Sequence, residues 1–380
     1  MLSVSLFLSL SVSAGGWYST KGNKIVNSAG QTVRLTGLNW FGFETNNEII
    51  HGLWAANLES MVAECKRRGF NTWRIPISAS VLQSWKAGVP KTKWDGNPSV
   101  NPDLTGLSNY DVFKKFVAAA SKNNQKIFLD LHSVIDDSYM DNLWYNAAHP
   151  PEYIISALEW FATTFRNEDT IIGIDVKNEP HGRCDKSDGT TAIWDKSSAQ
   201  NNWKSFIESA AKRILAANPN LLIMVEGIEC FNSPDKGAIW GWWGGNLSPV
   251  NYAGLGIDLG AYQNKLVYAP HEYGPSVSDQ AWFHAGFSYD TLYSEHWSNQ
   301  WMFIYDKGIA PLLFGEWGGH VQGANAVWMK AFVQLIGKYG FSQTFWCLNP
   351  NSGDTGGLVG NDWKTWDEVK YNIIKPILDL

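Results

Sequence analysis

Two glutamates stand where apolar segments end, in settings that suit paired acid and base chemistry. Glu179 closes the segment Ile174-Asp-Val-Lys-Asn-Glu, and Glu316 closes Pro311-Leu-Leu-Phe-Gly-Glu. Cleavage of a glycosidic bond uses such a pair, because one protonated carboxyl donates to the leaving oxygen while the other, ionised, attacks the anomeric carbon. The pair predicts this chemistry if the fold brings both side chains to one cleft.

Other polar or aromatic side chains stand at corresponding places, where further apolar segments end. They are Arg74, His132, Asn178, His271, Tyr273 and Trp346. If these segments are parallel strands of one closed sheet, their carboxyl ends meet at one mouth. We therefore expect all of these side chains to line or support a single site.

The segments themselves are rich in β-branched and aromatic residues, and they alternate with longer segments of helical period. This alternation favours a parallel sheet with helical crossovers. Eight strands are predicted, at 33–40, 72–78, 126–133, 171–178, 221–227, 266–273, 311–317 and 343–348. Helices are predicted between them at 57–69, 111–123, 152–165, 199–217, 291–306 and 325–338, and Gly340 is a helix stop.

Eight strand and helix units favour an α/β fold with a single (β/α)8 TIM barrel over a doubly wound sheet. The first predicted strand ends in Leu38-Asn-Trp-Phe41, which is not a glycine-rich nucleotide loop. Residues 19–33 contain turn formers and alternating side chains, so they are predicted to form a hairpin that closes the barrel bottom.

Long connections follow several of the predicted strands, and in a barrel they gather at the face where sites form. Cys184 follows the fourth strand and Cys230 follows the fifth. Because these loops are neighbours, Cys184 and Cys230 are the predicted disulfide among the three pairings that four cysteines allow. Cys65 and Cys347 are expected to be buried thiols.

The composition excludes several classes of protein. The 380 residues carry a formal net charge of −6, which argues against a nucleic-acid partner. The chain holds 21 Trp, while only 17% of its residues are charged. That balance is typical of a strongly aromatic core or of a flat-faced surface for an uncharged ligand.

The first 14 residues are apolar or small and end in Val12-Ser-Ala14, which predicts a secretory signal peptide, although no basic residue precedes the apolar stretch. Residues 15–380 are expected to form one catalytic barrel domain, with no linker or carbohydrate-binding module. The mature protein is expected to be extracellular, free of the membrane and monomeric.

Several motifs together resemble a known family. Ile174-Asp-Val-Lys-Asn-Glu-Pro-His181, Ala269-Pro-His-Glu-Tyr273 and Phe314-Gly-Glu-Trp-Gly318 resemble the strand-end motifs of glycoside hydrolase family 5, the cellulase family. GLNWFGFET (37–45), HGLW (51–54), WWGGNL (242–247) and NPNSGDTGGL (349–358) are similar to those of its secreted endo-β-1,4-glucanases. The resemblance covers the chain after residue 14 and implies hydrolysis of internal β-1,4-glucosidic bonds.

The resemblance also implies roles for single residues. Glu179 would be the general acid and base, and Glu316 the nucleophile of a retaining double displacement. Arg74 and Tyr273 would keep Glu316 ionised. Asn178 would bind the sugar 2-hydroxyl, and His132 and His271 would complete the polar floor.

The substrate-binding residues are expected to combine aromatic platforms with polar side chains, because sugar rings present both C–H faces and hydroxyls. Trp346 would lie beneath the cleaved sugar. The other predicted platforms are Trp40, Trp242 and Trp243, and the predicted polar contacts on the non-reducing side are His51, Asn46 and Asp354.

Alternatives remain open at this point. β-Mannan or mixed-linkage glucan could replace cellulose as substrate, and a non-catalytic carbohydrate-binding barrel would keep the Trp platforms but need only one carboxylate. Glu226 is the rival catalytic carboxylate, and Arg74 could pair with Asp130 or Asp175. No metal or other cofactor is expected, because Asp130-Leu-His132 supplies one histidine and no His-x-His pair.

Overall fold

The computed structural model describes residues 16–186 and 188–379, so the predicted signal peptide lies outside the described residues. Its centre is a parallel eight-stranded sheet in the spatial order β11-β8-β7-β6-β5-β4-β15-β13. These strands are β4 (Thr36–Asn39), β5 (Thr72–Ser78), β6 (Lys126–Ser133), β7 (Ile171–Asp175), β8 (Leu222–Val225), β11 (Leu266–Tyr268), β13 (Leu313–Phe314) and β15 (Ser342–Phe345). A parallel bridge between Tyr268 and Leu312 joins the two edges, which closes the barrel.

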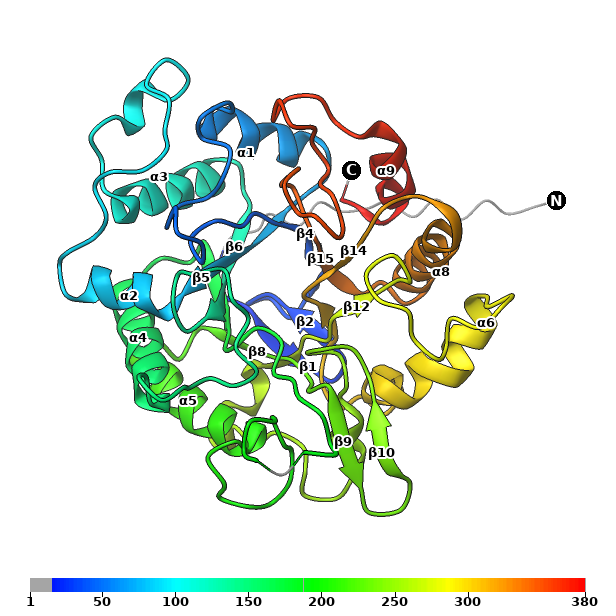
Figure 1. Cartoon of the computed structure of the whole chain (residues 1–380). Coiled ribbons are helices and arrows are strands. Elements are labelled where there is room, and N and C mark those ends of the chain that lie inside the picture. The colour runs from blue at the N-terminus through cyan, green and yellow to red at the C-terminus, as the bar shows by residue number, and fades with distance from the viewer. Residues whose placement is uncertain (1–15, 187, 380) are drawn as a thin grey trace.

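Helices surround the closed sheet (Figure 1). They are α1 (Leu58–Arg67), α2 (Ala79–Lys86), α3 (Asn109–Lys122), α4 (Pro151–Thr164), α5 (Trp203–Ala217), α6 (Tyr289–Thr291), the π-helix η4 (Leu292–Met302), α7 (Phe303–Asp306), α8 (Gly323–Tyr339) and α9 (Glu368–Ile374). Short 3₁₀ turns lie at Pro102–Leu104, Ser248–Asn251, Gly260–Lys265 and Lys375–Ile377. The (β/α)8 prediction is confirmed.

Local sequence explains where several helices begin and end. The side chain of Asn57 accepts a hydrogen bond from the Ser60 amide at the start of α1, and Ser108 caps α3 in the same way. Gly340 ends α8 with φ of +67°, a left-handed conformation that glycine adopts without a Cβ penalty. The helix stop predicted at Gly340 is therefore confirmed.

Two predicted strands are each divided in the structure. The segment 266–273 forms β11 and then β12 (Glu272–Tyr273), and 311–317 forms β13 and then β14 (Trp317–Gly318). β12 and β14 pair with each other, outside the main sheet. Pro270 lies between β11 and β12 and has no N–H to donate to a ladder, which accounts for the interruption there.

The N-terminal hairpin consists of β1 (Ser19–Lys21) and β2 (Lys24–Val26), and a third short strand, β3 (Thr32–Val33), pairs with β2. Ile25 and Tyr18 are buried in a cluster with the barrel side chains Leu222, Met224 and Val267. These contacts plug the end of the barrel opposite the strand carboxyl ends, as predicted.

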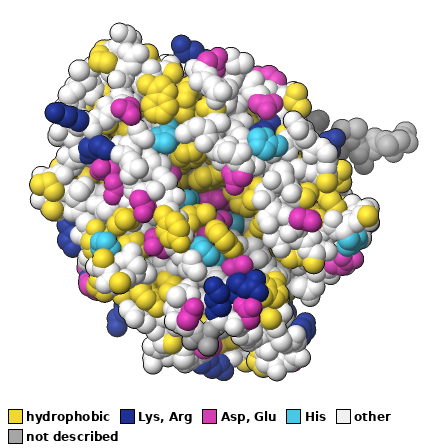
Figure 2. Space-filling model, viewed as in Figure 1, with side chains coloured by type: hydrophobic (Ala, Val, Ile, Leu, Met, Phe, Trp, Pro, Cys, Tyr) yellow, Lys and Arg dark blue, Asp and Glu magenta, His cyan; other side chains and the backbone are white. Residues whose placement is uncertain are grey.

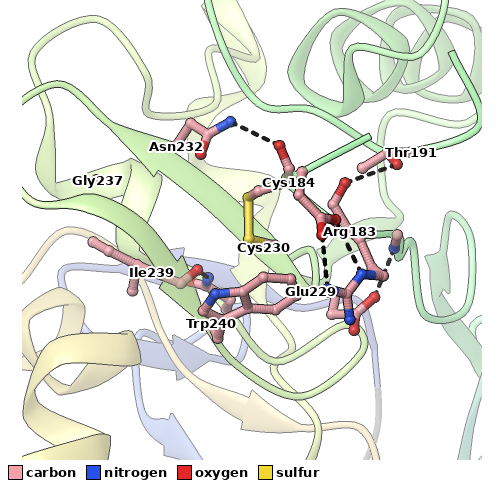
Figure 3. Close-up of a disulfide and its surroundings, with 12 residues drawn as sticks. Arg183, Cys184, Thr191, Glu229, Cys230, Asn232, Gly237, Ile239 and Trp240 are labelled. Atoms are coloured by element: carbon pink, nitrogen blue, oxygen red, sulfur yellow. Dashed lines mark hydrogen bonds and ion pairs between the residues drawn. A yellow bond between two sulfur atoms is a disulfide. The ribbon is translucent and has the colours of Figure 1, made fainter. Parts of the chain in front are cut away.

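An antiparallel hairpin of β9 (Cys230–Ser233) and β10 (Gly237–Trp240) follows β8. Cys230 forms a disulfide with Cys184, so the predicted pairing is confirmed (Figure 3). Cys65 and Cys347 are buried free thiols. Within residues 16–186 and 188–379, no helix has both the length and the apolar character needed to cross a bilayer.

Candidate active site

A cleft of about 570 Å³ opens above the carboxyl ends of the barrel strands, and both Glu179 and Glu316 line it. On this face the molecule is hollowed at its centre, with acidic and histidine side chains inside the hollow and hydrophobic ones around it (Figure 2). The cleft lies where a barrel places its catalytic groups.

Glu316 lies between β13 and β14, with only 4% of its surface exposed. Its Oε1 accepts a hydrogen bond from Arg74 Nη1 at 2.6 Å, and its Oε2 accepts one from the Tyr273 hydroxyl at 2.7 Å. Burial alone would raise the pKa of Glu316, but the charges of His271, Arg74 and His132 outweigh it and lower that pKa below its ordinary value. Glu316 is therefore ionised at neutral pH.

Glu179 follows β7 and is 6% exposed. Its backbone has φ of +47°, and its N–H donates to Glu226 Oε2 at 2.8 Å, which anchors this left-handed residue. The side chain contacts His271 Nδ1 through Oε1 at 2.8 Å. Burial raises the pKa of Glu179 to about 7, the charge of Glu316 adds to the rise, and His271 opposes it. Desolvation therefore contributes more to the raised pKa of Glu179 than like-charge repulsion by Glu316 does.

The two glutamates form a close pair of opposite ionisation. One carboxylate oxygen of each, together with a nitrogen of His271, lies within 4.8 Å of the others. Carboxyl groups about 5–5.5 Å apart act in retaining glycosidases, whereas inverting enzymes separate them by about 6.5–9.5 Å to admit a water. The spacing therefore fits direct attack by Glu316.

Arg74 is fully buried and joins the nucleophile to the barrel core. It donates to Glu316, to Asn178 Oδ1 at 2.9 Å and to Glu226 Oε1 at 3.1 Å. Its guanidinium also pairs with Asp130 and Asp175 at 3.1 and 3.0 Å. The predicted contact with Glu316 and the alternative pairing with buried aspartates are thus both present.

Glu226, the rival carboxylate, is fully buried and does not line the cleft. Burial raises its pKa well above the ordinary range, and burial together with the neighbouring Glu226 does the same for Asp175. Each shift disfavours the ionised carboxylate, while both groups still accept a hydrogen bond from Arg74. Glu226 holds the Glu179 backbone and contacts His271 Nε2 at 3.1 Å, which is a supporting position.

The two predicted histidines differ in their exposure to the cleft. His132 lines it, and its Nδ1 contacts Asp130 Oδ2 at 2.6 Å. Burial lowers the pKa of His132, but Asp130 outweighs that effect and the net shift is upward. His271 lies beneath the surface between Glu179 and Glu226, and Asn178 is also fully buried, with its Nδ2 against Met140 Sδ at 3.0 Å.

Trp346 follows β15 and provides the aromatic floor of the cleft. Its ring stacks on His132 at 5.6 Å and on Phe41 at 5.5 Å between centroids. Trp40, by contrast, is fully buried, and its ring packs in the core at 5.6 Å from Trp73. The prediction of Trp40 as a platform is wrong, because the adjacent residue, Phe41, takes the inward direction.

Trp242 and Trp243 both line the cleft, as predicted. Trp242 is only 7% exposed, with its ring 6.1 Å from that of Tyr273. Trp243 is 40% exposed and stacks on His181 at 3.8 Å, with an angle of 5° between the rings. Trp243 therefore offers the larger free aromatic face of the two.

The opposite end of the cleft contains the predicted polar residues His51, Asn46 and Asp354. His51 contacts Thr45 Oγ1 and Asn351 Nδ2, each at 3.0 Å. Burial lowers the pKa of His51 to about 4, so its ring is neutral at pH 7. These residues lie in the same cleft as the glutamates.

Sequence reasoning missed Glu44, a buried carboxyl that also lines the cleft. Its Oε2 accepts a hydrogen bond from the Gly42 amide at 2.8 Å. Burial raises the pKa of Glu44 to about 7. Glu44 and Phe41 both lie in the motif GLNWFGFET, in which only Trp40 is predicted to bind substrate. The motif indicates a binding site but does not show which of its side chains point into the cleft.

The sequence of this chain matches one protein family and is similar to several known endoglucanases. Residues 26–352 match the family described as Cellulase (glycosyl hydrolase family 5). Endoglucanase G of Acetivibrio thermocellus is 40% identical over 404 residues, which cover 95% of this chain and 71% of that protein. An endoglucanase of Paenibacillus polymyxa is 36% identical over 375 residues, covering 97% of this chain and 89% of that protein.

A solved structure shows the same fold. It is a cellotetraose complex of an endocellulase from Pyrococcus horikoshii, with a TM-score of 0.86 at 32% identity. The match covers 96% of this chain and 98% of that one.

Proposed function

The chain belongs to glycosyl hydrolase family 5, the cellulase family, and is a retaining endo-β-1,4-glucanase; we propose that Glu179 is its general acid and base and Glu316 its nucleophile. The observation that carries this assignment is the opposite ionisation of two adjacent buried carboxyls. The pKa of Glu179 is raised to about 7, while that of Glu316 is lowered. One can therefore donate a proton while the other attacks.

In the first step Glu316 attacks the anomeric carbon, and Glu179 transfers its proton to the oxygen of the departing chain. The glycosidic C–O bond breaks as the ester bond to Glu316 forms. In the second step Glu179 removes a proton from water, the resulting oxygen attacks the same carbon, and Glu316 leaves as a carboxylate. Two inversions give net retention.

The groups around Glu179 favour its protonated form in the first step and its ionised form in the second. While Glu316 is ionised, its charge supports the raised pKa of Glu179 and so favours the protonated acid. Once Glu316 is esterified, that charge disappears, and the hydrogen bond from His271 favours the carboxylate needed as base. Arg74 and Tyr273 stabilise Glu316 when it returns as an anion.

We infer positions for the glucan chain from the residues that line the cleft. Trp346 would stack beneath the sugar that is cleaved. Asn178 is buried beside the acid, and its Nδ2 would have to leave Met140 Sδ to donate to the 2-hydroxyl of that sugar. His51, Asn46 and Asp354 would contact units on the non-reducing side. Trp243 would stack on the unit that leaves, because it lies beside His181, two residues after the acid Glu179.

Substitution of each glutamate tests the assignment. Glu179→Gln and Glu316→Gln are isosteric and should each remove nearly all activity on carboxymethyl cellulose while preserving the circular dichroism spectrum. Glu226→Gln is the matched control for a buried, non-catalytic acid and should retain more activity than either. Activity within about tenfold of wild type in either catalytic variant, equivalent to about 1.4 kcal/mol of barrier, would overturn the roles.

The mode of cleavage has its own measurement. Internal cuts should lower the viscosity of carboxymethyl cellulose well before many reducing ends appear, and β-mannan should be cut far more slowly. Release of cellobiose without an early fall in viscosity would contradict the endo mode.

We also propose that the protein is secreted and that the mature protein is a monomer. The support is the apolar segment ending at Ala14 and the Cys184–Cys230 disulfide, which suits an oxidising compartment. Mass spectrometry of protein secreted by the native host should find Gly15 at the amino terminus, and light scattering should give the monomer mass. A chain that retains Met1 inside the cell would contradict export.

A further inference from the structure

The catalytic cleft continues into a second hollow of about 540 Å³. The two hollows share Ser138, Met140 and Trp243, so they are neighbours across the Trp243 ring. The second hollow is also lined by His181 and Gly182. It therefore lies on the side of the acid Glu179, where the departing part of the substrate must lie to receive its proton.

Two loops form the walls of this second hollow: the Tyr139 loop (residues 138–146) and the Cys184 loop (residues 181–186 and 188–191). Asn142 joins them. Its backbone oxygen accepts a hydrogen bond from the His181 amide at 3.1 Å, and its side-chain Nδ2 donates to the Thr190 oxygen, also at 3.1 Å. Hydrogen bonds to the backbone therefore tie the two walls together.

The outer side of the Cys184 loop is bonded to β9 and to Glu229, the residue before β9. The Cys184–Cys230 disulfide joins them, the Gly182 amide donates to Glu229 Oε2 at 2.8 Å, and Asn232 Nδ2 donates to the Cys184 oxygen at 3.4 Å (Figure 3). These contacts are all made within the protein and fix this wall to β9. A preformed groove loses less conformational entropy on binding than a loop that must first be ordered.

The lining suits a neutral chain of hydroxylated rings. Tyr139 is 62% exposed and lies at the rim of this hollow and of the next, which has about 800 Å³ and includes Tyr145. Arg183, Lys186 and Glu229 provide donors and acceptors of both charges. An aromatic face beside mixed polar groups matches the C–H faces and hydroxyls of glucosyl units.

We propose that the groove between the Tyr139 loop and the Cys184 loop binds glucosyl units of the departing chain beyond the one at Trp243, with Tyr139 as the stacking platform. The inference rests on the proposed function, because it takes Glu179 as the proton donor. It makes the enzyme favour long chains whose departing end fills this groove.

The test compares a long substrate with one whose leaving group cannot reach the groove. Tyr139→Ala should lower kcat/KM for cellohexaose about three- to tenfold and leave kcat/KM for 4-nitrophenyl β-cellobioside within about twofold of wild type. With cellohexaose carrying ¹⁸O at its reducing end, the variant should cut closer to the labelled end, since longer departing fragments lose their extra contact.

Tyr262→Ala is the matched control, because Tyr262 is 37% exposed in the 3₁₀ turn Gly260–Lys265 and lines none of the three hollows. It should change neither substrate ratio nor cut position. The inference is overturned if Tyr139→Ala keeps the wild-type ratio and cut position, or if Tyr262→Ala changes both to the same extent. Wild-type inactivity on both substrates would instead contradict the proposed function.

Discussion

At the scale of single residues, the site depends on how two identical side chains acquire different protonation states. Glu316 faces a cation and a hydroxyl donor, whereas Glu179 contacts a histidine and a neighbouring negative charge. Both are buried, so burial alone does not distinguish them. The difference comes from the hydrogen-bonding partners, which belong to separate strands.

The pH dependence of activity should report these two states. The pKa of Glu179 is raised to about 7, and its acid form is lost as the pH rises through that value, so kcat/KM should fall on the basic side near pH 7. The lowered pKa of Glu316 places the acidic fall below the ordinary glutamate value of about 4.3. A plateau of kcat/KM reaching about pH 9 in a folded enzyme would contradict the role of Glu179.

Most residues around the glutamates could be predicted from the sequence, since strand ends in a barrel converge. Arg74, Tyr273 and His132 occupy the expected places. The prediction of Trp40 as a platform failed because adjacent residues after a strand face opposite sides, and the motif alone does not show which side faces the cleft.

At the scale of elements, prediction worked best where a segment follows one regular period. β5 and β6 have the predicted bounds, 72–78 and 126–133. The predicted helix 291–306 is instead α6, a π-helical stretch and α7. A search for spacings of three and four cannot distinguish a wider π turn from an α turn, because both keep apolar residues on one side.

The disulfide between Cys184 and Cys230 should stabilise the folded protein. The two residues are separated by 46 positions in the sequence, and closing a loop of that size constrains the unfolded chain. The double variant Cys184→Ala/Cys230→Ala should lose about 2–4 kcal/mol of unfolding free energy, measured by urea titration.

Reductant supplies the control for this variant. Dithiothreitol should lower the urea midpoint of the wild type towards that of the double variant and leave the variant itself unchanged. An identical midpoint for oxidised wild type and variant would show that the bond adds no stability.

At the scale of the whole molecule, the barrel separates the face that reacts from the end that is plugged. The catalytic cleft lies at the strand carboxyl ends, and the hairpin of β1 and β2 fills the other end. The 21 Trp divide accordingly: nine are fully buried in the core, while Trp243 presents a free face to the cleft. An aromatic composition thus serves both packing and recognition.

Substitution in the plug should affect stability without affecting catalysis. Ile25 is 3% exposed against Leu222 and Val267, so Ile25→Ala should lower the unfolding free energy by about 2–4 kcal/mol. Activity at 25 °C should stay within about twofold of wild type, because the cleft lies at the far end.

Lys21→Ala, at an exposed position on the same hairpin, is the matched control and should change neither quantity. A large loss of kcat/KM in folded Ile25→Ala protein would show that the two ends of the barrel are coupled.

The central claim is that Glu316 forms a covalent bond with the sugar while Glu179 moves the proton. Incubation with 2,4-dinitrophenyl 2-deoxy-2-fluoro-β-cellobioside, followed by digestion and mass spectrometry, tests it directly, because the fluorine slows hydrolysis of the glycosyl-enzyme. The fluorocellobiosyl group should be found on Glu316. Its attachment to Glu179 or Glu226, or turnover with no covalent adduct, would contradict the account.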